Sequence, residues 1–111
     1  MAAEPIPTEP IRIDGEEALE DLTKERELVL ADFYADWCGP CQMLEPRLET
    51  IAADTEATVA KVDVDANQAL ASSYGVRGVP TLVLFVDGEP TERLVGLQSE
   101  DDLRGVIDAR T

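Results

Sequence analysis

Histidine is absent from this 111-residue chain, and cysteine occurs only twice, at Cys38 and Cys41. A structural zinc site usually has four nitrogen or sulfur ligands, so this composition argues against zinc bound within one chain. The missing histidine also removes the side chain whose ordinary pKa lies closest to neutral pH. The groups left to titrate near neutrality are the two thiols, the α-amino group and any carboxylate whose pKa is strongly raised by its surroundings.

Lysine is almost as scarce, with Lys24 and Lys61 alone, while 24 acidic and nine basic residues give a formal net charge of −15. This balance argues against nucleic acid or an anionic membrane as a partner. One interpretation is an ordinary acidic protein with a well-solvated surface. We favour adaptation to a cytoplasm of high salt, because at molar ionic strength the Debye length falls to about 3 Å and self-repulsion largely disappears.

The N-terminal segment has neither a basic start nor an apolar run. We therefore expect no signal peptide and no membrane anchor there, and we expect a cytoplasmic protein. The prolines Pro5, Pro7 and Pro10 predict an extended, partly disordered arm over residues 1–10. Residues 11–111 are long enough to form one domain with its own core.

Hydrophobic periodicity predicts alternating strands and helices. The apolar run over residues 28–34, broken only by Asp32, predicts a central strand buried on both faces. A helix should follow to about residue 54, kinked at Pro46, with an inner stripe of Cys41, Leu44, Leu48 and Ile51. We expect further strands near residues 11–13, 58–64, 81–86 and 91–95, and further helices near residues 16–26, 66–74 and from Ser99 onward. These elements predict an α/β sandwich with a mixed sheet.

The two cysteines are separated by two residues. At this spacing on the first turn of a helix they lie on one face, close enough for their sulfur atoms to bond without backbone movement. As a structural staple so short a loop would contribute roughly 2 kcal/mol, against nearly 5 kcal/mol for a 100-residue loop. We therefore favour a reversible, redox-active disulfide over a purely structural one.

Residues 31–41, with the sequence ADFYADWCGPC, resemble the active-site strand and turn of the thioredoxin family. The likeness continues through YGVRGVPT at residues 74–81, the Asp87-Gly88 turn and Val95-Gly96. The resemblance covers nearly the whole chain after the first ten residues. The motif WCGPC combined with the later GVPT is far more specific for this family than two cysteines separated by two residues. The resemblance implies a thioredoxin-like fold, with a central mixed β-sheet flanked by helices.

Two cysteines with different tasks are expected. If the helix starts at or near Cys38, backbone N–H groups and the positive end of the helix dipole stabilise a Cys38 thiolate, which makes Cys38 the attacking nucleophile. Cys41, one turn further in, should be more buried and act as the resolving thiol.

By resemblance, Asp32 is the buried acid that accepts the Cys41 proton through water. Burial in an apolar strand should raise its pKa. The alternative is a local bulge that turns Asp32 to solvent. Lys61 matches the lysine that in this family lies near that acid and tunes it, and the alternative there is a solvated strand lysine.

A trans peptide bond before Pro80 is the ordinary expectation, since only about 5 to 6% of X-Pro bonds are cis. The resemblance reverses it and implies a cis proline that faces the cysteines and leaves the backbone of Val79 free to pair with a substrate strand. It also implies a substrate groove whose residues are Trp37, Gly39, Pro40, Val64, Val79, Pro80, Val95 and Gly96. For Val64 and Val95 a place in the core is the alternative.

Together these features predict a monomeric protein-disulfide reductase that needs no metal and no cofactor beyond the Cys38–Cys41 disulfide. By resemblance it takes electrons from thioredoxin reductase or an equivalent donor and passes them to disulfide-bearing client proteins. A disulfide isomerase or oxidase is one alternative, disfavoured by the Gly39-Pro40 insert. A non-catalytic binding subunit is another, and the complete set of Asp32, both cysteines and Pro80 argues against it. Two departures from the family pattern are Gln42, where a lysine is common, and Tyr34, where many members have tryptophan.

Overall fold

The computed structural model describes residues 5–111, so the first four residues of the expected N-terminal arm lie outside the described residues. Residues 5–10 form neither helix nor strand, and the extended arm over residues 1–10 stays a prediction. Within the described range, no helix is long and apolar enough to cross a membrane. The elements are β1 (Ile11–Arg12), α1 (Glu16–Glu25), β2 (Leu28–Tyr34), α2 (Gly39–Asp54), β3 (Thr58–Asp63), α3 (Gln68–Ser73), β4 (Thr81–Val86), β5 (Glu89–Val95) and α4 (Glu100–Asp108).

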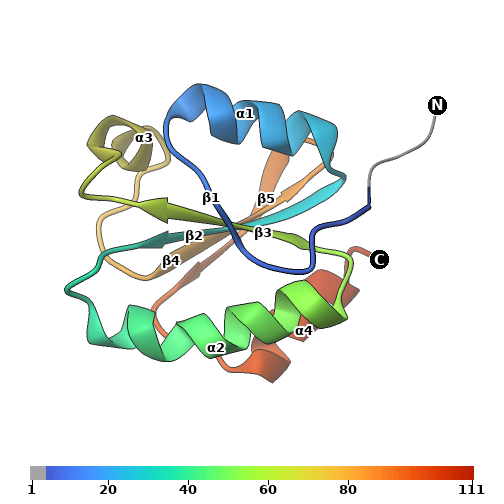
Figure 1. The fold of residues 1–111 in the computed structure, drawn as a ribbon. Helices are drawn as coiled ribbons and strands as arrows, with labels where there is room; N and C mark the ends of the chain where they lie inside the picture. Colours follow the sequence, from blue (N-terminus) through green and yellow to red (C-terminus); the bar gives the residue numbers. More distant parts are fainter. Residues whose placement is uncertain (1–4) are drawn as a thin grey trace.

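The strands form one mixed sheet in the order β1-β3-β2-β4-β5. The strands β1, β3 and β2 run parallel, whereas β4 and β5 pair antiparallel to their neighbours. A parallel pair cannot be joined by a tight turn, so α2 fills the crossover between β2 and β3. Figure 1 shows α1 and α3 on one face of the sheet and α2 and α4 on the other. The predicted α/β class with a central mixed sheet flanked by helices is confirmed.

Strand β2 is buried along its whole length, as the apolar run predicts. Because side chains alternate across a strand, Leu28 and Leu30 join the core beneath α2 and α4, while Val29 and Phe33 join the core beneath α1. Asp32 is fully buried in this strand, in unbroken register with both β3 and β4. The local bulge considered for Asp32 is therefore wrong.

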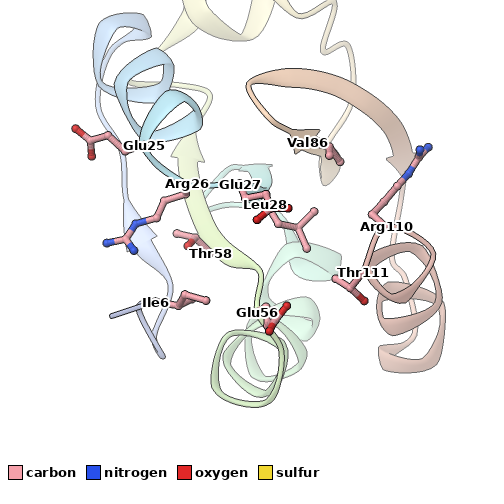
Figure 2. A pocket seen from close by; sticks show the side chains of 10 residues that line it. All are labelled: Ile6, Glu25, Arg26, Glu27, Leu28, Glu56, Thr58, Val86, Arg110 and Thr111. Atoms are coloured by element: carbon pink, nitrogen blue, oxygen red, sulfur yellow. The ribbon is translucent and has the colours of Figure 1, made fainter. Parts of the chain in front are cut away.

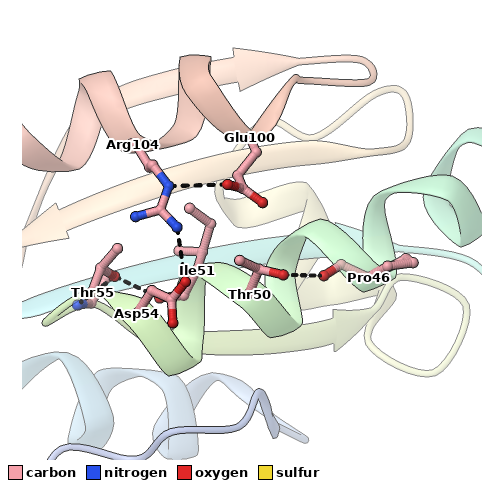
Figure 3. A network of polar contacts seen from close by, with 8 residues as sticks. Pro46, Thr50, Ile51, Asp54, Thr55, Glu100 and Arg104 are labelled. Carbon is pink, nitrogen blue, oxygen red and sulfur yellow. Dashed lines mark hydrogen bonds and ion pairs between the residues drawn. The ribbon is translucent and has the colours of Figure 1, made fainter.

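Helix α2 is continuous through Pro46. Its buried stripe consists of Cys41, Leu44, Leu48, Ile51 and Ala52, which includes all four predicted positions. The Thr50 hydroxyl donates to the Pro46 carbonyl at 3.1 Å. Figure 3 shows how Arg104 ties α4 to this helix, with Nη2 3.0 Å from Asp54 Oδ2 and Nε 3.1 Å from Glu100 Oε2.

The β4–β5 hairpin turns at Asp87 and Gly88, whose φ angles of 52° and 86° suit a two-residue turn between twisted strands. Strand β5 begins at Glu89, two residues earlier than predicted, and the pairing contains an irregularity between Leu84 and Phe85. Beyond this irregularity, Phe85 pairs with Pro90 and Val86 with Glu89, which extends β5 toward the turn. Hydrophobic periodicity alone does not reveal such a shift in register.

Candidate active site

Cys38 and Cys41 form a disulfide where β2 leads into α2, with their Cα atoms 5.2 Å apart. Cys38 is the N-cap of α2, and its Sγ accepts a hydrogen bond from the Cys41 N–H at 3.1 Å. The first helical N–H groups have no intrahelical partner, so this end of α2 can stabilise a thiolate on Cys38 when the disulfide is reduced.

Burial does not separate the two cysteines in the disulfide form. Cys38 is 4% exposed and Cys41 is 3% exposed. Cys41 is therefore only marginally the more buried of the two in this form, because both cysteines lie with Tyr34 and Ala35 in one small buried cluster.

The sequence between the cysteines suits the start of a helix. Gly39 is the first residue of α2, and Pro40 follows within the first turn, where a missing N–H breaks no helical hydrogen bond. Both residues are exposed. Beyond the pair, the Gln42 side chain donates to the Asp36 carbonyl at 3.0 Å, so this departure from the family pattern braces the loop before the helix.

The Val79–Pro80 peptide bond is cis, as the resemblance implies. Cys38 Sγ lies 3.7 Å from the Val79 carbonyl oxygen, so the segment before β4 faces the disulfide. The Pro80 carbonyl accepts a hydrogen bond from the Gly96 N–H at 2.8 Å. Three separate parts of the chain, near Cys38, at Val79-Pro80 and at Gly96, are thus brought together around the disulfide.

Exposed apolar side chains flank this region. Trp37 is 71% exposed, and its indole Nε1 donates to Asp65 Oδ2 at 2.8 Å. Val95 is 67% exposed, so the core alternative for Val95 is wrong. Val64 is partly buried and packs against both the cysteine cluster and the core beneath α1.

Asp32 is the unusual acid of the site. Among the described residues, neither of its carboxyl oxygens has a hydrogen-bond partner. Desolvation raises the pKa of Asp32 to about 7, with the nearby Lys61 charge lowering it and the Glu45 charge raising it. Asp32 lies on the same face of β2 as Tyr34, which packs with the cysteines. A carboxyl group with this pKa can exchange a proton near neutral pH without histidine.

Lys61 is the register partner of Asp32 on β3. Its side chain is only 18% exposed, so it is not a solvated strand lysine. The ammonium donates to Glu45 Oε1 at 2.7 Å and lies 4.2 Å from the centroid of the Tyr34 ring. Sequence reasoning missed Glu45, although its position four residues after Cys41 places the two on neighbouring turns of one helix.

Two further features of the described chain concern metal ions and cavities. Within residues 5–111, no group of three or more histidine, cysteine or acidic side chains could hold a metal ion. A pocket of about 440 Å³ lies at the other end of β2 and β3, where Leu28 and Thr58 begin those strands (Figure 2). The disulfide and Asp32 are not among the residues that line it.

Comparisons with known proteins agree with this geometry. Residues 10–109 match the family model described as Thioredoxin. A thioredoxin from Staphylococcus aureus is 46% identical over 90 residues, which cover 79% of this chain and 86% of that protein. A mutant thioredoxin from Halobacterium salinarum NRC-1, of known structure, is 62% identical with a TM-score of 0.95, covering 97% of this chain and 96% of that one.

A thioredoxin of known structure from Fasciola hepatica is 37% identical, with a TM-score of 0.83 and coverage of 91% of this chain and 99% of that one. Sequence and structure thus agree over almost the whole described chain, including the segment that holds the bonded cysteines. This chain belongs to the thioredoxin family and is a thiol-disulfide oxidoreductase.

Proposed function

We propose that this protein carries two electrons from a separate reductase, thioredoxin reductase or an equivalent donor, to disulfide bonds in client proteins. The observation that carries the proposal is the Cys38–Cys41 disulfide at the N-terminus of α2, with Cys38 beside the Val79 backbone. The disulfide is placed where a thiolate is stabilised and where an extended client segment can reach it.

In the first step, the Cys38 thiolate attacks one sulfur of the client disulfide. A Cys38–client disulfide forms, and the other client sulfur leaves as a thiolate. In the second step, the Cys41 thiol gives its proton to the Asp32 carboxylate through water, and the resulting thiolate attacks Cys38 Sγ. The Cys38–Cys41 bond forms and the client leaves as a thiolate. The client gains two electrons, and the donor reductase later returns two electrons to the protein.

Client binding uses the surface around the disulfide. The Val79 backbone pairs with an extended client segment, as in strand addition to an open edge. The exposed Trp37 and Val95, with Gly39, Pro40, Val64 and Gly96, supply an apolar rim, while Pro80 itself is buried and acts through its cis bond to Val79. A solved structure with 30% identity to this chain concerns thiol resolution in a yeast mitochondrial 1-Cys peroxiredoxin via glutathione and thioredoxin systems, which supports disulfide-bearing proteins as the client class.

The protein acts as a monomer, in a cytoplasm of high salt. The catalytic domain spans residues 11–111, and the described residues 5–10, which form neither helix nor strand, precede it. The relative from Halobacterium salinarum supports the high-salt setting, as does the net charge of −15. The disulfide is the only redox centre that the mechanism uses.

The test is reduction of a model disulfide protein by this protein in the presence of a dithiol. We expect Cys38→Ser to abolish turnover, and Cys41→Ser to keep a nucleophile and accumulate mixed disulfides with clients. Mass spectrometry of the adducts identifies the cysteine involved. Adducts that form on Cys41 in the Cys38→Ser variant, with none in the Cys41→Ser variant, would show that the two roles are reversed.

A further inference from the structure

The buried acid and the lysine opposite it do not pair. Asp32 and Lys61 are register partners on β2 and β3, and strand alternation places both side chains on the face that α2 covers. Yet the Lys61 ammonium donates to Glu45 Oε1 at 2.7 Å. Both carboxyl oxygens of Asp32 lack a hydrogen-bond partner among the described residues. The lysine charge is therefore directed to a carboxylate on the helix and not to the carboxylate opposite it on the sheet.

We propose that Glu45 is a positioning residue for proton transfer, whose carboxylate holds the Lys61 ammonium against the Tyr34 ring and away from the Asp32 carboxyl group. The proposal rests on the proposed role of Asp32 as acceptor of the Cys41 proton. It adds a residue of α2 that sets how strongly Asp32 attracts that proton.

The relative burial of the three groups explains the arrangement. The Glu45 side chain is 52% exposed and stays solvated while it binds the lysine. Asp32 is fully buried, so ionising it to pair with Lys61 carries a desolvation cost. Lysine has a flexible stem and a compact charge, so without Glu45 the ammonium can turn toward Asp32. A carboxylate paired directly with an ammonium binds a proton weakly and accepts one poorly near neutral pH.

The charged groups around Asp32 come from two elements. Lys61 approaches from β3 and Glu45 from α2, and both influence the Asp32 charge. On the remaining side, the register partner on β4 is the apolar Leu82. Farther out, Glu9 of the arm and Glu49 of α2 line the same groove as Glu45 and Lys61. Glu49 lies one helical turn beyond Glu45 and carries the same charge, so it provides a matched control.

The experiment is a titration of the Asp32 carboxyl carbon by NMR in the full-length oxidised protein, which requires no turnover. We expect Glu45→Gln to lower the midpoint by roughly 0.5 pH units or more, part of the shift of about 1 to 3 units that a close opposite charge produces. Glu49→Gln should leave the midpoint nearly unchanged. A midpoint that moves equally in the two variants, or in neither, would overturn the proposal.

A double-variant comparison separates positioning from simple repulsion between carboxylates. Lys61→Met keeps an apolar stem beside the Tyr34 ring and removes the ammonium. If Glu45 acts through Lys61, Glu45→Gln shifts the Asp32 midpoint much less in the Lys61→Met protein than in the wild type. Equal shifts in both backgrounds would refute positioning and leave only direct repulsion.

Measuring the rate of mixed-disulfide resolution tests the role of Asp32 separately from the role of Glu45. Resolution of a preformed mixed disulfide should show a pH profile that moves with the Asp32 midpoint in Glu45→Gln. If Asp32→Asn leaves that resolution rate unchanged, Asp32 is not the proton acceptor and the positioning role falls with it, even where the titration shifts as expected.

Discussion

Asp32 combines two properties that rarely occur together, full burial and the absence of a hydrogen-bond partner among the described residues. Burial of an ionised carboxylate is costly, so its pKa rises from an ordinary 3.8 to about 7. Near neutral pH the carboxyl group can therefore either hold or accept a proton. The protein tolerates an unfavourable group in its core at the position where the proposed mechanism needs a base.

The same shift makes stability depend on pH. Because the folded pKa of Asp32 lies above the unfolded one, the folded protein binds the extra proton between about pH 4 and pH 7, and stability falls as pH rises through this range. Below that range the cost is absent, and above it the cost is complete and constant. The full shift corresponds to roughly 4 kcal/mol.

We therefore expect Asp32→Asn to raise the free energy of unfolding by a few kcal/mol at pH 8 and by much less at pH 4. Urea denaturation of the oxidised protein at both pH values measures the difference. Asp21→Asn, the same change at an exposed position of α1, is the control and should show no such trend. A gain for Asp32→Asn that is the same at pH 4 and pH 8 would contradict the raised pKa.

At the scale of elements, β2 and α2 organise the site. Strand β2 pairs with β3 on one side and β4 on the other, so it carries Asp32 into the centre of the sheet. It then leads to the cysteines at the start of α2, whose buried stripe holds the helix against the sheet. Helix α4 packs against the same core through Leu103 and Ile107 and closes this layer.

Helix α4 depends on its N-cap. The Ser99 hydroxyl accepts a hydrogen bond from the Asp102 N–H at 3.0 Å, and three acidic residues follow in the first turn, as suits the positive end of a helix. We expect Ser99→Ala to lower the free energy of unfolding by about 1 kcal/mol, measured by urea denaturation at neutral pH. Ser72→Ala, an exposed change within α3, is the control. Equal effects at the two serines would mean that the cap contributes nothing specific.

At the scale of the whole molecule, negative charge dominates. Acidic side chains outnumber basic ones by 24 to nine. Ion pairs of Lys61, Arg104 and Arg110 with acidic side chains lie at the surface, and both partners of each pair are at least partly exposed. Partly exposed pairs of this kind contribute little, so most of the acidic surface is balanced by solvent and salt.

We expect the melting temperature of the oxidised protein to rise by several degrees between 0.1 M and 2 M KCl, because the Debye length shortens from about 10 Å to about 3 Å or less. Calorimetry across this range measures the change. A triple variant of exposed acids on α1, Glu17→Gln, Glu20→Gln and Glu25→Gln, should be less sensitive to salt. A melting temperature that is flat across the range would remove the high-salt interpretation and leave the redox chemistry intact.

The amino-acid sequence by itself determined the elements and the reacting groups of this protein. The apolar run of β2 and the buried stripe of α2 are visible in the spacing of apolar residues along the chain, and each occurs as predicted. The Asp87-Gly88 turn and the Ser99 cap depend on interactions between residues close in the chain, and they too occur as predicted. The motif WCGPC and its partner GVPT identified the disulfide and the cis proline through resemblance.

Only the tertiary structure decided which distant side chains meet. The ion pair of Lys61 with Glu45 joins residues 16 apart, and the Trp37–Asp65 hydrogen bond joins residues 28 apart. Strand order and register set both contacts, and they also set the exposure of Val95. Hydrophobic periodicity contains no information about strand order or register. The partner of Lys61 was decided by geometry and solvation: α2 lies over β3, and a half-exposed carboxylate keeps its charge at lower cost than a buried one.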